Sequence, residues 1–403
     1  MTNGLVRFVA VAIVTMLTPS CGAVAASCAP VGTWLVPSQQ GKRLSADNAI
    51  SRLAERQVVL LGESHGNADD HRWQLQVLAA LHGRRPDLRI GLEMLPRAAQ
   101  PVLDRWMAGE LSVKAFLESV NWDRVWGYNS NLYMPIFEFS RMNQVPLIAI
   151  NIPRSLVAKV RDEGWAAIPD EERVGVGDPA TAPSAYSDML ADVFVVKERM
   201  AAGGHEDSAM APTSDAERMA LVDDPEFQRF VEAQLTWDRA MAEALAEVAL
   251  ARTEAPLVVG IVGRGHAEGG HGIAHQLRDL GVDDIGIAVT TTESCANLPT
   301  GLADLVFVTT VQEVGSSPGP RLGILIDRAD DGVVVRHVVP DSVAAEAGIK
   351  ETDIITEAAG FALSDPGDLI RIVRRQAPGT WLPLVLMRDG EGLHLVAKFP
   401  MHF

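Results

Sequence analysis

Two turns of the same form are the strongest chemical feature of the sequence. Residues 62–65 read Gly-Glu-Ser-His and residues 263–266 read Gly-Arg-Gly-His, and each turn directly follows a short apolar run. Histidine changes its protonation near neutral pH and also binds metals, while glycine allows a sharp bend or a close backbone contact. One Gly-x-x-His turn is a weak signal, but two in equivalent positions predict a shared functional site.

Other polar residues come at equivalent positions. Glu93 ends a second apolar run, and Asn151 follows a third. Ligands of an open parallel sheet gather beyond the carboxyl ends of its strands, so residues at those ends lie near one another. We therefore predict one site with four candidate catalytic residues: Glu63, His65, Glu93 and His266.

Asp238 is a fifth candidate. It lies on the otherwise apolar stripe of residues 227–250, whose spacing predicts a long helix. A buried carboxylate needs a partner, and three remain open: a catalytic histidine, a structural arginine or a helix end. His71 also stays open, as a supporting residue of the site or as an ordinary residue at a helix start. His271 and His275 are expected to be solvated residues of a helix.

The candidate site predicts hydrolytic chemistry of two kinds. In the first, His65 and His266, with Glu93 or Glu63, hold a divalent metal such as zinc or manganese. The bound water attacks an amide or ester, and a second carboxylate acts as general base. In the second there is no metal, and His65 itself activates a water or a substrate hydroxyl.

Buried strands must position these residues. Five short apolar runs are bounded by turn residues: 58–61, 88–92, 146–150, 256–262 and 285–289. Nearly continuous apolar runs of this length are typical of parallel strands that are covered on both faces. Helical spacing separates them, as at 70–81 and 227–250. The pattern predicts an α/β fold with a mostly parallel sheet and helices on both faces.

Two further segments lie outside this pattern. Residues 162–224 are rich in Pro, Gly, Ser, Asp and Ala and include His205, so we expect short helices and loops that form a lid or a contact surface. Residues 126–135 contain Gly, Asn and Pro, which predict a loop. The aromatic side chains of this loop, among them Tyr128 and Tyr133, either anchor it over the sheet or form a wall for a flat aromatic ligand.

The composition and the N-terminus bear on location. A net charge of −17 argues against nucleic acid as a partner. Residues 1–26 are typical of a signal peptide that directs export to the periplasm, with a short apolar stretch and an Ala-Val-Ala pattern before the cleavage point. In the alternative, Cys21 carries a lipid anchor to the membrane. Cys28 and Cys295 would then form a disulfide or remain as unrelated thiols.

The last part of the chain has a different pattern. Residues 311–320 read as a linker after a main domain at 27–310, and residues 321–403 resemble a bacterial PDZ domain, a small, partly open β-barrel with helices. The resemblance rests on the loop 321–324, the run 340–349 and Asp-Ile-Ile at 353–355. Such domains add a peptide as a strand to a sheet edge. The resemblance implies that the backbone amides near Leu322, Gly323 and Ile324 hold the carboxylate of a peptide or protein C-terminus. A scaffold without a ligand is the alternative.

The main domain also resembles a known family. The matching segments are 58–67, 91–95, 122–141, 150–151, 233–242 and 262–266. They are similar to the ChaN-type haem-binding uptake family, which belongs to the Tiki/TraB and erythromycin-esterase-like superfamily. The resemblance spans about residues 53–289 and implies a parallel-sheet fold, an envelope location and haem or iron acquisition. Superfamily members proposed as metal-dependent proteases and hydrolases use the same paired turns and a glutamate.

Two functions therefore compete. An exported carrier would bind haem through an axial histidine or tyrosine, with Tyr128, Tyr133 and His205 as candidates, and would dock through its PDZ domain. A hydrolase would use the turns at 62–65 and 263–266 and receive its substrate from the PDZ domain. The oligomeric state stays open, and a homodimer is compatible with both functions.

Overall fold

The computed structural model describes residues 29–201, 212–251, 255–292, 298–311, 320–329 and 331–401. The signal peptide, Cys21, the Cys28–Cys295 pair, His205 and most of the linker lie outside these ranges. No helix of the described ranges has the length and apolar character needed to cross a membrane.

The main sheet has eight strands in the order β2-β1-β8-β7-β3-β6-β4-β5. Strands β3 to β8 run parallel to one another, and β1 is antiparallel to both β2 and β8. The prediction of a mostly parallel sheet is confirmed. The strands are β1 (Trp34–Val36), β2 (Lys42–Leu44), β3 (Val58–Glu63), β4 (Arg89–Pro96), β5 (Leu147–Asn151), β6 (Val258–Gly263), β7 (Ile285–Thr291) and β8 (Leu305–Val308).

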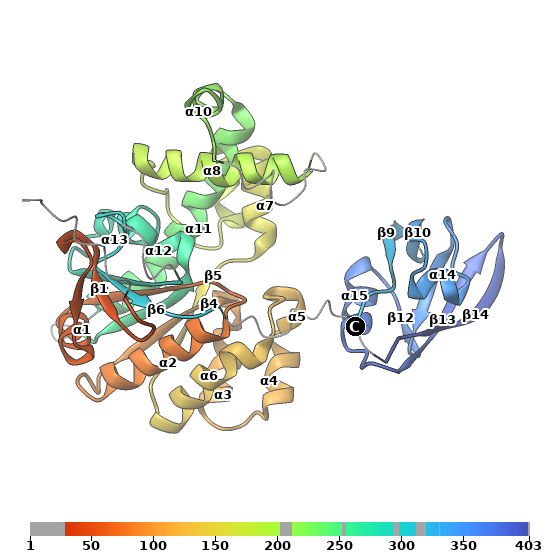
Figure 1. Cartoon of the computed structure of the whole chain (residues 1–403), viewed down its shortest axis with the longest axis horizontal. Coiled ribbons are helices and arrows are strands. Elements are labelled where there is room, and N and C mark those ends of the chain that lie inside the picture. The colour runs from red at the N-terminus through yellow and green to blue at the C-terminus, as the bar shows by residue number, and fades with distance from the viewer. Residues whose placement is uncertain are drawn as a thin grey trace, which may run out of the picture.

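Helices cover both faces of this sheet (Figure 1). Side chains of β3 alternate between two cores: Val59 and Leu61 pack on one face, and Val58 and Leu60 pack on the other. The first face carries α1 (Ala46–Ala54), α2 (Ala68–His82), α3 (Gln100–Met107), α4 (Val113–Ser119), α5 (Trp122–Val125) and α6 (Ser130–Asn143). The second carries α11 (Pro225–Leu250), α12 (Arg264–Ala267) and α13 (Ile273–Asp279).

The predicted insertion is more regular than its composition indicates. It contains α8 (Ser184–Ala201) and α10 (Asp215–Leu221), and it is preceded by α7 (Arg154–Glu163). Tyr186 and Phe194 of α8 pack with Phe227 and Phe230 of α11 in a small core of their own. The 18-residue helix α8 therefore corrects the expectation of short helices only.

The prediction of a loop over residues 126–135 is wrong from Ser130 onward. Asn129 caps α6 by accepting a hydrogen bond from the backbone N–H of Asn131, at 3.0 Å. Pro135 lies inside this helix. Asn129 was therefore a helix-start signal, and the loop ends at the cap.

The C-terminal part forms an antiparallel sheet in the order β14-β13-β11-β10-β9, with β12 paired to β11. Its core is separate from that of the main sheet. Strand β9 lies at one edge, and α15 packs beside β9 and β10. The elements are β9 (Ile324–Ala329), β10 (Gly332–Val338), α14 (Val343–Ala347), β11 (Ile354–Ala358), β12 (Phe361–Ala362), α15 (Pro366–Arg374), β13 (Trp381–Arg388) and β14 (Glu391–Lys398).

Candidate functional site

The first Gly-x-x-His turn holds a carboxylate–imidazole pair. Glu63 ends β3, and its Oε1 lies 2.6 Å from Nδ1 of His65. The other oxygen, Oε2, is buried and has no hydrogen-bond partner in the described part of the chain; Nε2 of His71 lies 3.9 Å from it. That nitrogen of His71 also lies 3.2 Å from the backbone carbonyl oxygen of His65. His71 therefore supports the turn, which settles its open role.

The second turn holds a pair of the same kind. Nδ1 of His266 lies 2.6 Å from Oδ1 of Asp238, which is fully buried on α11. The other carboxylate oxygen, Oδ2, accepts a hydrogen bond from the hydroxyl of Tyr186 at 2.5 Å. The partner that Asp238 requires is thus a histidine of the site, and α8 of the insertion supplies a second partner.

Glu93 lies between the two pairs. Its Oε2 accepts a hydrogen bond from the backbone N–H of Gly263 at 2.5 Å, and its Oε1 lies 3.7 Å from Nε2 of His266. A Cβ on Gly263 would lie 2.7 Å from Cε1 of His65 and 3.5 Å from Oε2 of Glu93. The absence of a side chain at Gly263 therefore lets the first imidazole approach the second turn and Glu93.

Asn151 stabilises this arrangement from β5. Its side-chain amide donates a hydrogen bond to the backbone carbonyl oxygen of Glu93 at 2.6 Å, and its Oδ1 accepts one from the indole of Trp237, also at 2.6 Å. The Trp237 ring packs edge-on against His266, with the ring centroids 5.1 Å apart. The strand ends and α11 thus bring together all five predicted catalytic residues: Glu63, His65, Glu93, Asp238 and His266.

The carboxylates change the proton affinity of both imidazoles. Burial alone would lower the pKa of His266, but the charges of Asp238 and Glu93 raise it to about 9. Burial likewise opposes the protonation of His65, yet the hydrogen bond and charge of Glu63 raise its pKa above the ordinary value. His266 is therefore mainly protonated at neutral pH.

The residues predicted as metal ligands lie together at the carboxyl edge of the sheet. No group of three or more His, Cys, Asp or Glu side chains in the described ranges is placed to hold a metal ion. His65 and His266 each direct one ring nitrogen at a carboxylate partner, and Glu93 binds a backbone amide. His65, His266 and Glu93 therefore lie together as a hydrogen-bonded cluster, and their assignment as ligands of zinc or manganese stays a prediction.

Aromatic rings border the exposed side of His65. The ring centroids of Trp126 and Tyr128 lie 4.8 and 4.9 Å from that of His65. Tyr128 is 40% exposed, and its hydroxyl makes no hydrogen bond within the described residues. Tyr133 is 0% exposed, and its hydroxyl donates to the backbone carbonyl of His65 at 3.3 Å. Burial also raises the pKa of Tyr133 far above its usual range. The position of Tyr133 is therefore unsuited to the predicted haem contact.

Sequence reasoning missed two residues of the site. Tyr186 lies in the insertion, where only its burial beside Asp238 shows its role. Trp237 is next to Asp238 in the sequence, and its indole contact with Asn151 depends on the packing of α11 against β5. His275 lies apart from the cluster, with Nε2 2.9 Å from the carbonyl oxygen of Thr181.

The predicted peptide loop lies at the start of the edge strand β9. The carbonyl oxygens of Leu322 and Gly323 accept hydrogen bonds from the N–H groups of Ala344 and Val339, at 2.8 and 2.9 Å. Gly323 has a φ of +78°, and a Cβ there would lie 2.3 Å from that of Ser342. Glycine is therefore required at this turn.

The fold and the site define an α/β protein with paired histidines and carboxylates at the carboxyl edge of a mostly parallel sheet. The family model "Haem-binding uptake, Tiki superfamily, ChaN" matches residues 49–277, more than half of the chain. The chain therefore belongs to this family. A solved structure described as cofacial haem binding to ChaN of Campylobacter jejuni is 19% identical with a TM-score of 0.51. The match covers 68% of this chain and 96% of that one, and it shows the shared fold.

A second family model, the PDZ domain, matches residues 320–398. The HtrA3 PDZ domain bound to a phage-derived ligand is 25% identical, with a TM-score of 0.18 over 19% of this chain and 82% of that one. A serine endoprotease from Yersinia pestis is 29% identical, with a TM-score of 0.18 over 20% of this chain and 28% of that one. No curated protein matches the chain.

Proposed function

We propose that the protein is an exported haem-binding protein that acts in haem or iron acquisition and docks to a partner through its PDZ domain. Membership of the ChaN family supports haem binding. The exposed Tyr128 beside His65 and Trp126 carries the assignment of the haem surface.

The residues of this surface fit a haem. The macrocycle needs an apolar, flat contact and an axial oxygen or nitrogen ligand. Tyr128 supplies an exposed aromatic ring, which packs against the buried Trp126 with the ring centroids 5.6 Å apart, and the free Tyr128 hydroxyl supplies a ligand atom. Bound haem would supply the iron and the redox chemistry. The protein's own residues orient the macrocycle and hold its ligand.

Haemin titration of the full chain tests this assignment. A shifted Soret band is expected for the unmodified protein, and Tyr128→Phe should weaken haem binding by about tenfold or more, because the axial bond is lost. Tyr133→Phe is the matched control in the same aromatic cluster and should retain the shift. The haem proposal fails if the unmodified protein gives no shift. Loss of the shift in His65→Ala but not in Tyr128→Phe would instead assign the ligand to His65.

The PDZ domain offers an edge for the proposed partner. β9 is an edge strand, so its outer backbone groups are available to an added peptide strand. Leu325 of β9 and Ile370 of α15 are both exposed apolar residues, and they suit a peptide with an apolar C-terminus. Binding of such peptides, compared with their C-terminal amides, tests the docking role. Equal affinity for both would contradict carboxylate capture by Leu322, Gly323 and Ile324.

Export is tested by locating the protein in producing cells. We expect a mature N-terminus near residue 27, measured by mass spectrometry of the envelope fraction. A chain that retains residues 1–26 in the cytoplasm would contradict export. A lipid on Cys21 would replace the soluble form by an anchored one.

A second candidate function is hydrolysis without a metal. The observation that favours it is the pairing of each imidazole with a buried carboxylate, which leaves both Nε2 atoms near Glu93. His65 would accept a proton from water as the water oxygen bonds to the carbonyl carbon of an ester or amide. His266 would donate its proton to the leaving oxygen or nitrogen as that bond breaks. Both imidazoles would then exchange protons with solvent.

An ester-hydrolysis assay in the presence of a chelator tests this second function. We expect turnover that survives the chelator and falls by about 100-fold or more in His65→Ala and His266→Ala. His275→Ala is the control, since His275 lies outside the cluster. Activity that is abolished by the chelator, or that is unchanged in His65→Ala, would contradict the metal-free assignment.

A further inference from the structure

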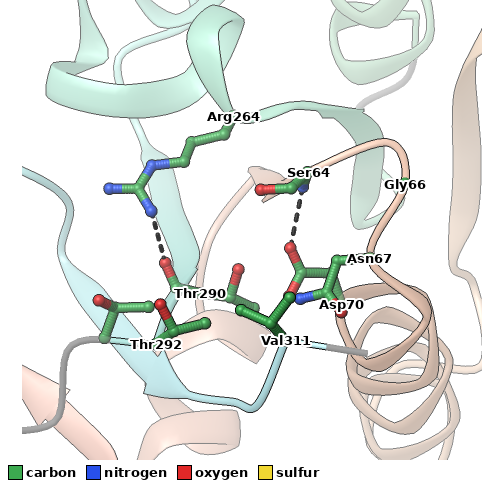
Figure 2. A pocket seen from close by; sticks show the side chains of 9 residues that line it. Ser64, Gly66, Asn67, Asp70, Arg264, Thr290, Thr292 and Val311 are labelled. Carbon is green, nitrogen blue, oxygen red and sulfur yellow. Dashed lines mark hydrogen bonds between the residues drawn. The ribbon is translucent and has the colours of Figure 1, made fainter. Parts of the chain in front are cut away.

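A polar pocket lies at the same carboxyl edge of the sheet as the two histidine–carboxylate pairs, but on the side of β3 that faces β7 (Figure 2). The connection after β3 leads towards β4, whereas the connection after β7 leads to β8, in the opposite direction along the sheet. Adjacent strands whose connections diverge open a crevice, and open α/β sheets bind ligands there. The pocket lies at this divergence and has a volume of about 310 Å³, at the small end of the range for ligand sites.

Donors that remain free line one wall of this pocket. Arg264 uses three of its five N–H groups: two bind Glu268 and one binds the backbone carbonyl oxygen of Thr290 at 2.9 Å. Two guanidinium N–H groups therefore remain. Thr290 is 2% exposed, and its hydroxyl makes no hydrogen bond within the described part of the chain. Thr292 also lies on this side in Figure 2.

A carboxylate lies on the opposite wall. Asp70 is almost fully buried and accepts hydrogen bonds from the Ser64 backbone N–H at 2.9 Å, the Asn67 amide at 2.8 Å and the Thr309 hydroxyl at 3.3 Å. Oδ1 receives two of these donors and Oδ2 only one, so Oδ2 can accept another. No cation pairs with Asp70 within the described residues, so the pocket favours a donor that carries positive charge.

The charges of the two walls define the ligand. Glu268 already balances Arg264, whereas no cationic side chain of the described residues pairs with Asp70 at the start of α2, so a plain anion is disfavoured. A ligand with a carboxylate at one end and an ammonium group at the other satisfies both walls without net charge. We propose that this pocket binds a small zwitterion, an α-amino acid, with its carboxylate at Arg264 and Thr290 and its ammonium group at Asp70.

Calorimetric titration of the full chain with three small molecules of similar size tests the proposal. L-alanine carries both charges, lactate replaces the ammonium group by a hydroxyl, and alaninol replaces the carboxylate by an alcohol. We expect L-alanine to bind at least tenfold more tightly than either analogue, because each analogue lacks one charge-assisted contact. Equal affinity for the three, or no heat with L-alanine at millimolar concentrations, would overturn the proposal.

Two variants locate the binding. Thr290→Val keeps the shape of a buried strand residue and should weaken L-alanine binding about five- to tenfold. Arg264→Gln should weaken it about twentyfold or more. Thr236→Val removes an equally buried hydroxyl, bonded to the Glu232 carbonyl oxygen, and should leave binding unchanged. Binding that survives in Thr290→Val and Arg264→Gln would overturn the assignment, and the haem proposal would stand independently of that result.

Discussion

The two Gly-x-x-His turns differ in where their carboxylates come from. In the first turn, Glu63 lies two residues before His65, so the pair forms within one strand end. In the second turn, His266 pairs with Asp238 from α11, and Asp238 in turn binds Tyr186 from α8. Three distant segments therefore assemble the second pair.

The surroundings of the two imidazoles differ in the same sense. The His65 side chain is 26% exposed and borders Tyr128, whereas that of His266 is 11% exposed and lies against Trp237. The first pair can meet a ligand or solvent directly. The second pair is largely enclosed by packing, and the charges of Asp238 and Glu93 raise the pKa of His266 in spite of that burial.

Removal of the distant carboxylate should have the largest effect. We expect Asp238→Ala to lower the free energy of unfolding by about 3–5 kcal/mol, because it leaves a buried, protonated His266 without its partner. Glu63→Ala should cost less, since the partly exposed His65 can be hydrated. Urea unfolding of both variants measures the difference. Equal losses would show that the two pairs are equally enclosed.

The pH dependence of the free energy of unfolding should reveal the same difference between the two pairs, with a somewhat smaller effect. The pKa of His266 is about 9 in the folded chain, above its ordinary value of 6.5. The stabilisation is therefore fully present below about pH 6.5 and is lost as the pH rises through 9, with a total of about 3 kcal/mol. Urea unfolding at several pH values checks this. His266→Gln should lose most of the pH dependence in this window, and an unchanged profile would contradict the assignment.

Much of the sheet was predictable because its central strands are continuous apolar runs. The run at 258–262 is buried on both faces of the sheet, and its sequence pattern has no other interpretation than a buried strand. β1, β2 and β8 are only three or four residues long, too short to give a pattern. Their place in the sheet depends on pairing with distant strands, which no local signal records.

The sequence could predict the candidate site only for residues whose position is determined by the end of a strand. Glu63 ends β3, Glu93 lies in the C-terminal half of β4 and His266 follows β6, so their convergence follows from parallel topology. The need of Asp238 for a partner was also visible, because it interrupts an apolar stripe. The identity of that partner was not, since helix packing alone brings Asp238 to His266.

A methyl group added to the second turn should have a smaller effect on stability, and it tests whether the two turns depend on each other. A Cβ on Gly263 would lie 2.7 Å from Cε1 of His65, while one on Gly265 would meet nothing within 4 Å. We expect Gly263→Ala to destabilise the fold by about 1–3 kcal/mol and to displace the His65 ring. Gly265→Ala, inside α12, should be neutral or slightly stabilising. Unfolding curves and the NMR shifts of the His65 ring measure both effects. If the two variants behave alike, the turns are not in contact and the two pairs act separately. If only Gly263→Ala moves His65, the enclosed second turn sets the position of the exposed imidazole in the first.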